Sequence, residues 1–111
     1  EQWPYKDIPI ETTFQSRFGP TEWLQPYTDK TLEALPSMGV TRIMMATPGF
    51  SSDCVETLEE IAIEGQATFK EARGSDFHMV SCLNDSPSHI RMIHTLIKPY
   101  ELFLVLVGFT F

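Results

Sequence analysis

The chain is organised around residues 43–64, IMMATPGFSSDCVETLEEIAIE. An apolar run over residues 43–46 leads into Thr47-Pro48-Gly49 and then into a helical pattern that carries a row of carboxylates. This order predicts a buried strand, a loop and a helix. Because ligands of open α/β sheets bind outside the carboxyl ends of the strands, we expect the chemistry of the protein at this junction.

Composition limits the class of protein. With 111 residues, 42% of them hydrophobic and 12% aromatic, the chain can form a core but no more than one small domain. Its 15 acidic residues against 8 basic ones leave a formal net charge of −7. Nucleic-acid partners require a basic face, so we expect none, whereas cations or a basic protein surface are compatible with this charge.

The cysteines and the two ends of the sequence bear on location. Cys54 and Cys82 form no C-x-x-C pair, which is typical of reduced, intracellular thiols. The first ten residues, EQWPYKDIPI, lack the cationic and apolar parts of a signal peptide. The apolar stretch over residues 102–111 is too short to cross a membrane as a helix. We therefore expect a cytoplasmic protein, with peripheral contact to the inner membrane left open.

Strands and helices alternate in the predicted order. The strands are expected over residues 10–16, 41–47 and 76–83, and a long helix over residues 53–70. The order βαβαβα predicts parallel strands joined by right-handed crossovers. The fold class is α/β, a three-layer, Rossmann-like parallel sheet with flanking helices. Three strands are few for such a sheet, so we expect a partial domain of a larger α/β protein.

A first helix is expected between residues 28 and 38. Thr28 or Asp29 can cap its start, and Gly39 can end it. Pro36 should kink or shorten it. Its predicted inner stripe consists of Leu32, Leu35 and Met38.

A last helix is expected before Pro99, which ends it. Ser86 is suited to its cap and Pro87 to its first position. Its predicted inner face consists of Ile90, Ile93, His94 and Ile97.

The long helix carries two contrasting faces when each residue advances by about 100°. Its predicted apolar side consists of Val55, Leu58, Ala62 and Phe69. Its opposite, acidic side consists of Asp53, Glu56, Glu60 and Glu64. Cations and transferred protons both favour carboxylate oxygens. A solvated face, with acidic residues favoured near a helix start, explains the same spacing, and spacing alone favours this second interpretation.

The loop over residues 15–23 lies at the same predicted edge of the sheet as the acidic helix start. Phe18, Trp23 and Phe50 can line a flat apolar cleft or simply pack beneath the loop, and the residues alone slightly favour packing. The three histidines share no metal-ligand spacing. Neither G-x-G-x-x-G nor G-x-x-x-x-G-K-[ST] occurs, which disfavours a nucleotide site.

Three longer stretches occur in a fixed order: residues 14–29, FQSRFGPTEWLQPYTD, residues 48–61, PGFSSDCVETLEEI, and residues 83–90, LNDSPSHI. Together they span most of residues 10–98 and resemble the C-terminal part of ferrochelatase, most closely the bacterial type without an iron–sulfur cluster. The resemblance implies a lyase of heme synthesis that inserts Fe²⁺, as substrate, into protoporphyrin IX or coproporphyrin. It implies no permanently bound cofactor.

The resemblance also implies roles for individual residues. Glu56 matches the family's active-site glutamate, expected to accept pyrrole protons or to handle the metal, and Asp53 and Glu60 match its acidic relay. The residues expected to contact the porphyrin are Gln15, Ser16, Arg17, Trp23 and Phe50. In family members the acidic helix begins with a widened, π-type turn that aims its carboxylates inward, which spacing alone does not reveal.

Some family features match nothing in this sequence. The family's essential histidine and its N-terminal half, which forms the other wall of the porphyrin cleft, lie upstream of residue 1. We therefore expect residues 1–99 to form a C-terminal half-domain whose partners are that N-terminal half, a porphyrin and ferrous iron. This half-domain should be inactive alone. Residues 100–111 form a hydrophobic tail without an assigned role.

Two alternatives remain open. One is a different class II chelatase that acts on a cobalt- or siroheme-type tetrapyrrole, although the stretch QSRFGPTEW argues against it. The other is a non-catalytic α/β binding module, in which the acidic row is ordinary solvated surface.

Overall fold

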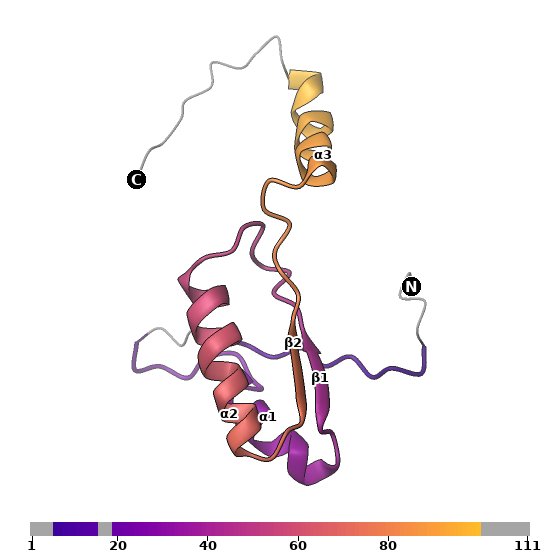
Figure 1. Ribbon diagram of the computed structural model, residues 1–111. Coiled ribbons are helices and arrows are strands. Elements are labelled where there is room, and N and C mark those ends of the chain that lie inside the picture. Colours follow the sequence, from indigo (N-terminus) through magenta and orange to yellow (C-terminus); the bar gives the residue numbers. More distant parts are fainter. Residues whose placement is uncertain (1–5, 16–18, 101–111) are drawn as a thin grey trace.

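The structure, a computed structural model, describes residues 6–15 and 19–100 (Figure 1). Its elements are, in order, α1 (Thr28–Ala34), η1 (Leu35–Met38), β1 (Arg42–Met45), η2 (Glu56–Gly65), α2 (Gln66–Glu71), β2 (Asp76–Met79), α3 (Pro87–Ile97) and η3 (Lys98–Tyr100). η1 and η3 are 3₁₀-helices and η2 is a π-helix. In the described ranges, every helix is too short or too polar to span a membrane.

β1 and β2 form a parallel two-stranded sheet, in which Arg42 pairs with Asp76 and Met45 with Met79. The strands predicted over residues 41–47 and 76–83 are confirmed in place and direction, although each is shorter than predicted. The chain passes from one strand to the other through η2 and α2, as parallel pairing requires. The α/β class is therefore confirmed.

The strand predicted over residues 10–16 is wrong for the part of it that the structure describes. Phe14 forms only an isolated parallel bridge with Tyr27. Its N–H donates to the Pro26 carbonyl (2.9 Å), and its own carbonyl accepts from the N–H of Thr28 (3.1 Å). Pro26 has no N–H to donate, so this pairing cannot extend into a ladder. The segment therefore joins the start of α1 instead of the sheet.

Helices cover one face of this sheet. Exposed and half-buried side chains alternate along both strands. Met44 is 66% exposed, whereas its neighbours Ile43 and Met45 are half-buried. The apolar run at residues 43–46 predicted a strand covered on both faces. Within the described residues the arrangement has two layers, the sheet and the helices α1, η2 and α2 (Figure 1).

The core lies where these helices meet the sheet. Its buried hydrophobic residues are Leu32, Ile61 and Phe69. The ring of Phe69 packs against that of Phe77, with 6.1 Å between the ring centroids. Gly74 makes room for this contact, because a Cβ at that position would lie 2.2 Å from the Phe69 ring. The core therefore joins α1, the acidic helix and β2 around one aromatic pair.

The first helix ends as its proline predicts. α1 stops at Ala34, and the chain tightens into η1, whose first turn contains Pro36. Gly39 then adopts φ 89° and ends the segment. The early end and the glycine stop are both confirmed. Met38, from the predicted inner stripe, is 74% exposed, because the 3₁₀ turn rotates it away from the row that begins at Leu32.

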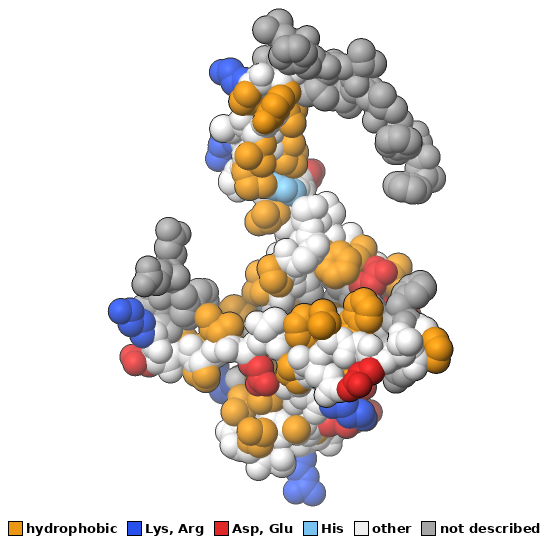
Figure 2. Space-filling model, turned by 180° about the vertical axis from the view of Figure 1, so that it is seen from behind, with side chains coloured by type: hydrophobic (Ala, Val, Ile, Leu, Met, Phe, Trp, Pro, Cys, Tyr) orange, Lys and Arg blue, Asp and Glu red, His pale blue; other side chains and the backbone are white. Residues whose placement is uncertain are grey.

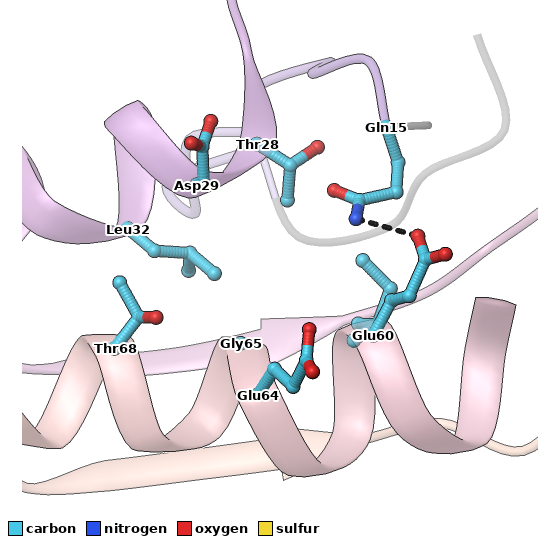
Figure 3. Close-up of a pocket in the computed structure, with 9 residues that line it drawn as sticks. Gln15, Thr28, Asp29, Leu32, Glu60, Glu64, Gly65 and Thr68 are labelled. Carbon is cyan, nitrogen blue, oxygen red and sulfur yellow. Dashed lines mark hydrogen bonds between the residues drawn. The ribbon is translucent and has the colours of Figure 1, made fainter. Parts of the chain in front are cut away.

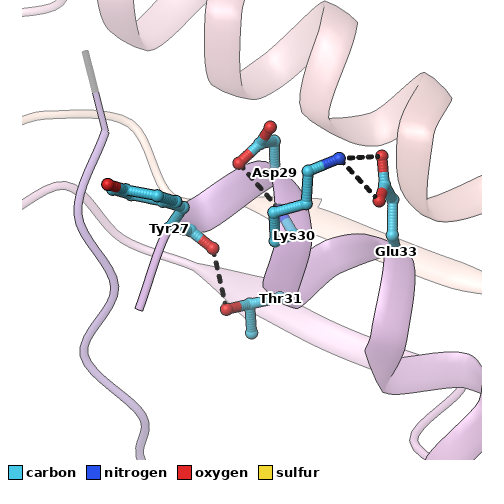
Figure 4. Close-up of polar contacts among 5 residues, drawn as sticks. All are labelled: Tyr27, Asp29, Lys30, Thr31 and Glu33. Carbon is cyan, nitrogen blue, oxygen red and sulfur yellow. Dashed lines mark hydrogen bonds and ion pairs between the residues drawn. The ribbon is translucent and has the colours of Figure 1, made fainter. Parts of the chain in front are cut away.

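The start of the first helix differs from the prediction. Tyr27 is the N-cap residue, and no side chain caps the helix. Asp29 accepts a hydrogen bond from the N–H of Lys30 (2.8 Å), and the Lys30 ammonium pairs with Glu33 at 3.0 Å (Figure 4). This ion pair is exposed and contributes little stability.

The last helix, α3, begins at Pro87, and Ser86 caps it by accepting a hydrogen bond from the N–H of His89 (3.4 Å). Its start is therefore confirmed, but its predicted inner face is not. The residues of that face, all exposed, are Ile90, Ile93, His94 and Ile97. Figure 2 shows apolar side chains gathered along this helix, which stands apart from the sheet layer in Figure 1. Within the described residues, no element covers this face.

Candidate functional site

The helix predicted over residues 53–70 forms mainly as the π-helix η2, which continues into α2. In a π-helix each N–H bonds to the carbonyl five residues earlier, and such turns are usually single bulges at functional sites. Here the π-helix runs for 10 residues. The widened turn that the resemblance implies is therefore present, in the segment that follows the carboxyl end of β1.

The wide turn changes which side chains face the core. The buried residues of the acidic helix are spaced four apart: Thr57, Ile61, Gly65 and Phe69. Val55 and Leu58, which were predicted to face inward, are 63% and 55% exposed. The prediction is wrong for these two residues, because it assumed about 100° per residue, whereas a π-helix holds more residues in each turn and advances less per residue. It is confirmed for Phe69, which is buried.

Three of the four acidic residues in this row are partly buried. Asp53, Glu56 and Glu60 are half-buried, and only Glu64 is exposed. The prediction that all four lie on the solvated side, opposite the core, is therefore wrong for the first three. Their surroundings differ, and so does the chemistry open to each.

Asp53 is held by a set of hydrogen bonds. The Asn84 side-chain amide donates to its Oδ2 (2.7 Å), while the N–H of Cys82 (3.2 Å) and the Thr57 hydroxyl (3.1 Å) donate to its Oδ1. Its own N–H donates to Asn84 Oδ1 at 2.8 Å. The hydrogen bonds from Asn84 and Cys82 hold the pKa of Asp53 below its ordinary value. Asp53 is therefore ionised at neutral pH and fixed in place by these donors.

Glu56 is the first residue of the π-helix. The Cys54 side chain and the N–H of Glu56 itself hydrogen-bond the carboxylate and lower the pKa of Glu56, while desolvation acts in the opposite direction. The group is therefore ionised at neutral pH, with oxygen lone pairs that can receive a proton or a cation.

Glu60 lies one turn further along and meets the loop before α1. Gln15 Nε2 donates to Glu60 Oε2 at 2.9 Å, across 45 positions of sequence (Figure 3). The contact borders a partly open pocket of about 90 Å³, lined by Gln15, Thr28, Asp29, Leu32, Glu60, Ile61, Glu64, Gly65 and Thr68. This space has room for water molecules or an ion but not for a macrocycle.

Trp23 and Phe50, two of the predicted porphyrin contacts, are 40% and 41% exposed, so each presents part of its ring to solvent. A wider hollow of about 420 Å³ lies on the outer face of η2, lined by Cys54, Val55, Leu58, Glu59, Ile63 and Glu64.

Two further predicted porphyrin contacts, Ser16 and Arg17, lie outside the described residues. Among the described residues, no group of three or more His, Cys, Asp or Glu side chains is arranged to hold a metal ion.

Two polar residues of this site were missed from the sequence. Asn84 was noted only within the stretch over residues 83–90, and Thr57 was given no role. Asn84 has φ 48°, a left-handed conformation that asparagine tolerates better than most residues. The Asn-Asp-Ser-Pro turn signal could have located this bend, but nothing local indicates that its side chain binds a residue 31 positions earlier.

Residues 1–100 match the family model Ferrochelatase. Ferrochelatase of Vibrio vulnificus is 57% identical over 88 residues, which are 79% of this chain and 28% of the relative. Ferrochelatase of a Chelativorans species is 60% identical over 87 residues, 78% of this chain and 25% of that relative. The chain thus spans about a quarter of the length of these relatives. It belongs to the ferrochelatase family.

Proposed function

We propose that this chain carries the C-terminal part of the active site of a ferrochelatase, a lyase that inserts ferrous iron into a porphyrin, protoporphyrin IX, to make heme. Glu56 accepts pyrrole protons and handles the metal, and Asp53 and Glu60 complete an acidic relay. The residues proposed to contact the porphyrin are Gln15, Ser16, Arg17, Trp23 and Phe50. Family membership supports the reaction, and the remaining parts of the cleft are assigned to the N-terminal half of the enzyme.

The partial burial of the acidic row is the observation that supports this proposal. Asp53, Glu56 and Glu60 are half-buried and not splayed into solvent. Glu60 accepts a hydrogen bond from Gln15, so the acidic helix meets the loop to which porphyrin contacts are assigned. A non-catalytic module with a wet acidic surface has no need of either feature.

Each carboxylate has a distinct part in the proposed reaction. Metal insertion requires that the pyrrole nitrogens lose their protons and that the cation exchange bound water for other oxygen ligands. Glu56, ionised at neutral pH, receives the proton. Glu60 lies one turn away and passes the proton onward along the helix. Asp53 keeps its charge and supplies a constant negative potential near the point where the cation approaches.

The proposal also states which part of a larger fold these residues form. Residues 1–99 are assigned to a half-domain of a three-layer, chelatase-like sheet, whose other strands and second helix layer come from the rest of the enzyme. The apolar face of α3 and the exposed Met44 of β1 support this assignment, because apolar surface of this kind is normally covered in proteins. The proposal includes no resident cofactor and no iron–sulfur cluster. The enzyme is assigned to the cytoplasm, with membrane contact left open.

The test uses a chimaera in which this chain replaces the matching segment of the Vibrio vulnificus relative. We expect the chimaera to insert Fe²⁺ or Zn²⁺ into protoporphyrin, followed anaerobically by absorbance, and Glu56→Gln to lower kcat by about 100-fold or more. Glu59→Gln, the same change at the exposed neighbouring glutamate, is the control and should leave kcat within about threefold. Glu56→Gln with parental turnover, or a folded but inactive chimaera, would contradict the proposal. Preference for a cobalt- or siroheme-type tetrapyrrole in the same assay would favour the other chelatase class.

A further inference from the structure

Asn84, in the turn between β2 and α3, is joined to the start of the acidic helix by several hydrogen bonds. Its side-chain amide donates to the Asp53 carboxylate (2.7 Å) and accepts from the Asp53 N–H (2.8 Å). Its backbone N–H donates to the carbonyl of Ser51 at 2.9 Å. One residue thus joins the loop after β2 to the loop after β1, at the carboxyl edge of the sheet.

We propose that Asn84 is a positioning residue, which sets the location of Glu56 by holding Asp53. This inference rests on the proposed function, since it assigns Asn84 a part in that same reaction. Asn84 is not itself proposed to contact porphyrin or iron.

Asp53 is linked through hydrogen bonds to Thr57, the residue after Glu56, and through Thr57 to Cys54. The Thr57 hydroxyl lies 3.1 Å from Asp53 Oδ1 and accepts from the N–H of Cys54 at 3.0 Å. Thr57 is fully buried, so it has little freedom to move independently. Thr57 follows Glu56 directly in the π-helix, and the Cys54 side chain lowers the pKa of Glu56 through hydrogen bonding. A displacement of Asp53 is therefore passed to the residues that flank and contact Glu56.

The site needs the chemistry of asparagine in particular. It requires a donor and an acceptor on one short side chain, and a backbone at φ 48°. Aspartate fits the backbone and the shape but would set a second carboxylate against Asp53. Glycine fits the backbone but removes the amide. The two substitutions therefore separate the hydrogen bonds of Asn84 from its role in forming the turn.

The size of the expected effect follows from the precision that catalysis requires. A displacement of about 1 Å in a catalytic group can lower a rate by roughly 100-fold. Asn84 acts through another residue, so we expect a smaller loss, about 10-fold or more in kcat, with the KM for porphyrin changed by less than about threefold. A defect of the fold alone would also lower the apparent kcat with KM unchanged, so kcat is expressed per folded enzyme, and the loss that remains after this correction measures the positioning role.

The test compares Asn84→Gly, Asn84→Asp and the control Asp85→Asn in the chimaera, with kcat and KM measured between about pH 6 and pH 8.5. Asp85 is exposed and adjacent, and its change should leave both constants unaltered. We expect Asn84→Gly to lose kcat equally across this range. We expect Asn84→Asp to be weakest at high pH and to recover toward low pH, because a shared proton restores a donor to Asp53. Cys82 and His89 also lie near Asn84, so each profile is divided by that of the parent chimaera.

Each outcome decides the question. Parental kcat in Asn84→Gly, or losses in both variants that only follow the folded fraction measured by circular dichroism, would overturn the positioning role. A loss in both variants without recovery of Asn84→Asp at low pH would overturn the hydrogen-bond mechanism. Glu56→Gln is assayed alongside. If it turns over normally, the proposed function fails; if it loses activity while Asn84→Gly does not, only the present inference fails.

Discussion

At the scale of single residues, neighbouring carboxylates of the site differ through their hydrogen-bond partners. Asp53 accepts from side-chain and backbone donors and is confined by them. Glu60 is contacted by Gln15 from a distant part of the sequence. Three acidic residues that look alike in the sequence therefore carry different chemistry. The difference comes from donors that only the fold brings close to them.

Asp53 should make stability depend on pH. Its pKa in the folded chain lies below the ordinary value of 3.8, so its contribution to stability is complete above that value and is lost as pH falls through the lowered one. We expect Asp53→Asn to unfold at a lower temperature than the parent chain at pH 7, with the difference narrowing near pH 3. Thermal melts by circular dichroism at both pH values test this, with Asp85→Asn as the control. A difference of equal size at both pH values would contradict it.

At the scale of elements, the acidic helix buries other side chains than those predicted. The α-helical periodicity predicted Val55 and Leu58 inside, whereas the π-helix buries Thr57 and Ile61. Glu56 and Glu60, predicted on the solvated side, are half-buried in this helix. The candidate site and part of the core therefore belong to the same helix.

Truncation of single side chains should show which face of this helix belongs to the core. We expect Ile61→Ala to lower the free energy of unfolding of the chain by about 2–4 kcal/mol, because it leaves a cavity in the core. Leu58→Ala, on the exposed face of the same helix, should cost less than about 1 kcal/mol. Urea unfolding of both variants measures these values. The reverse order would contradict a core that contains Ile61 and excludes Leu58.

Much of the element order could be predicted because its signals are local. Pro36, Gly39, Ser86 and Pro87 mark helix ends through their own backbone and side-chain properties, and the structure agrees at each. The first strand failed because its partner segment contains Pro26. The contacts of Gln15 and Asn84 join residues 45 and 31 positions apart, which no local signal encodes. The resemblance supplied the widened turn that periodicity could not.

At the scale of the whole molecule, the described part of the chain is one layer of helices on one sheet, with α3 extending beyond it (Figure 1). The acidic row and the rings of Trp23 and Phe50 belong to this one unit. No second wall faces them within the described residues. A porphyrin bound here by this chain alone would keep one face in solvent, which weakens both its orientation and the removal of water.

The isolated chain should therefore not catalyse metal insertion. We expect no turnover above background for Fe²⁺ or Zn²⁺ with protoporphyrin, whereas the chimaera turns over. Equal concentrations of the two, assayed in parallel by absorbance, give the comparison. Robust insertion by the isolated chain would show that one wall is sufficient.

The two-stranded sheet has a consequence for handling the protein. With only β1 and β2 paired in the described residues, each strand keeps one side whose N–H and C=O groups have no neighbouring strand. Such edges recruit strands from other copies, and the exposed Met44 adds an apolar contact beside one of them. Self-association through these edges should limit the solubility of the isolated chain, and a fusion partner that supplies an adjoining strand should relieve it.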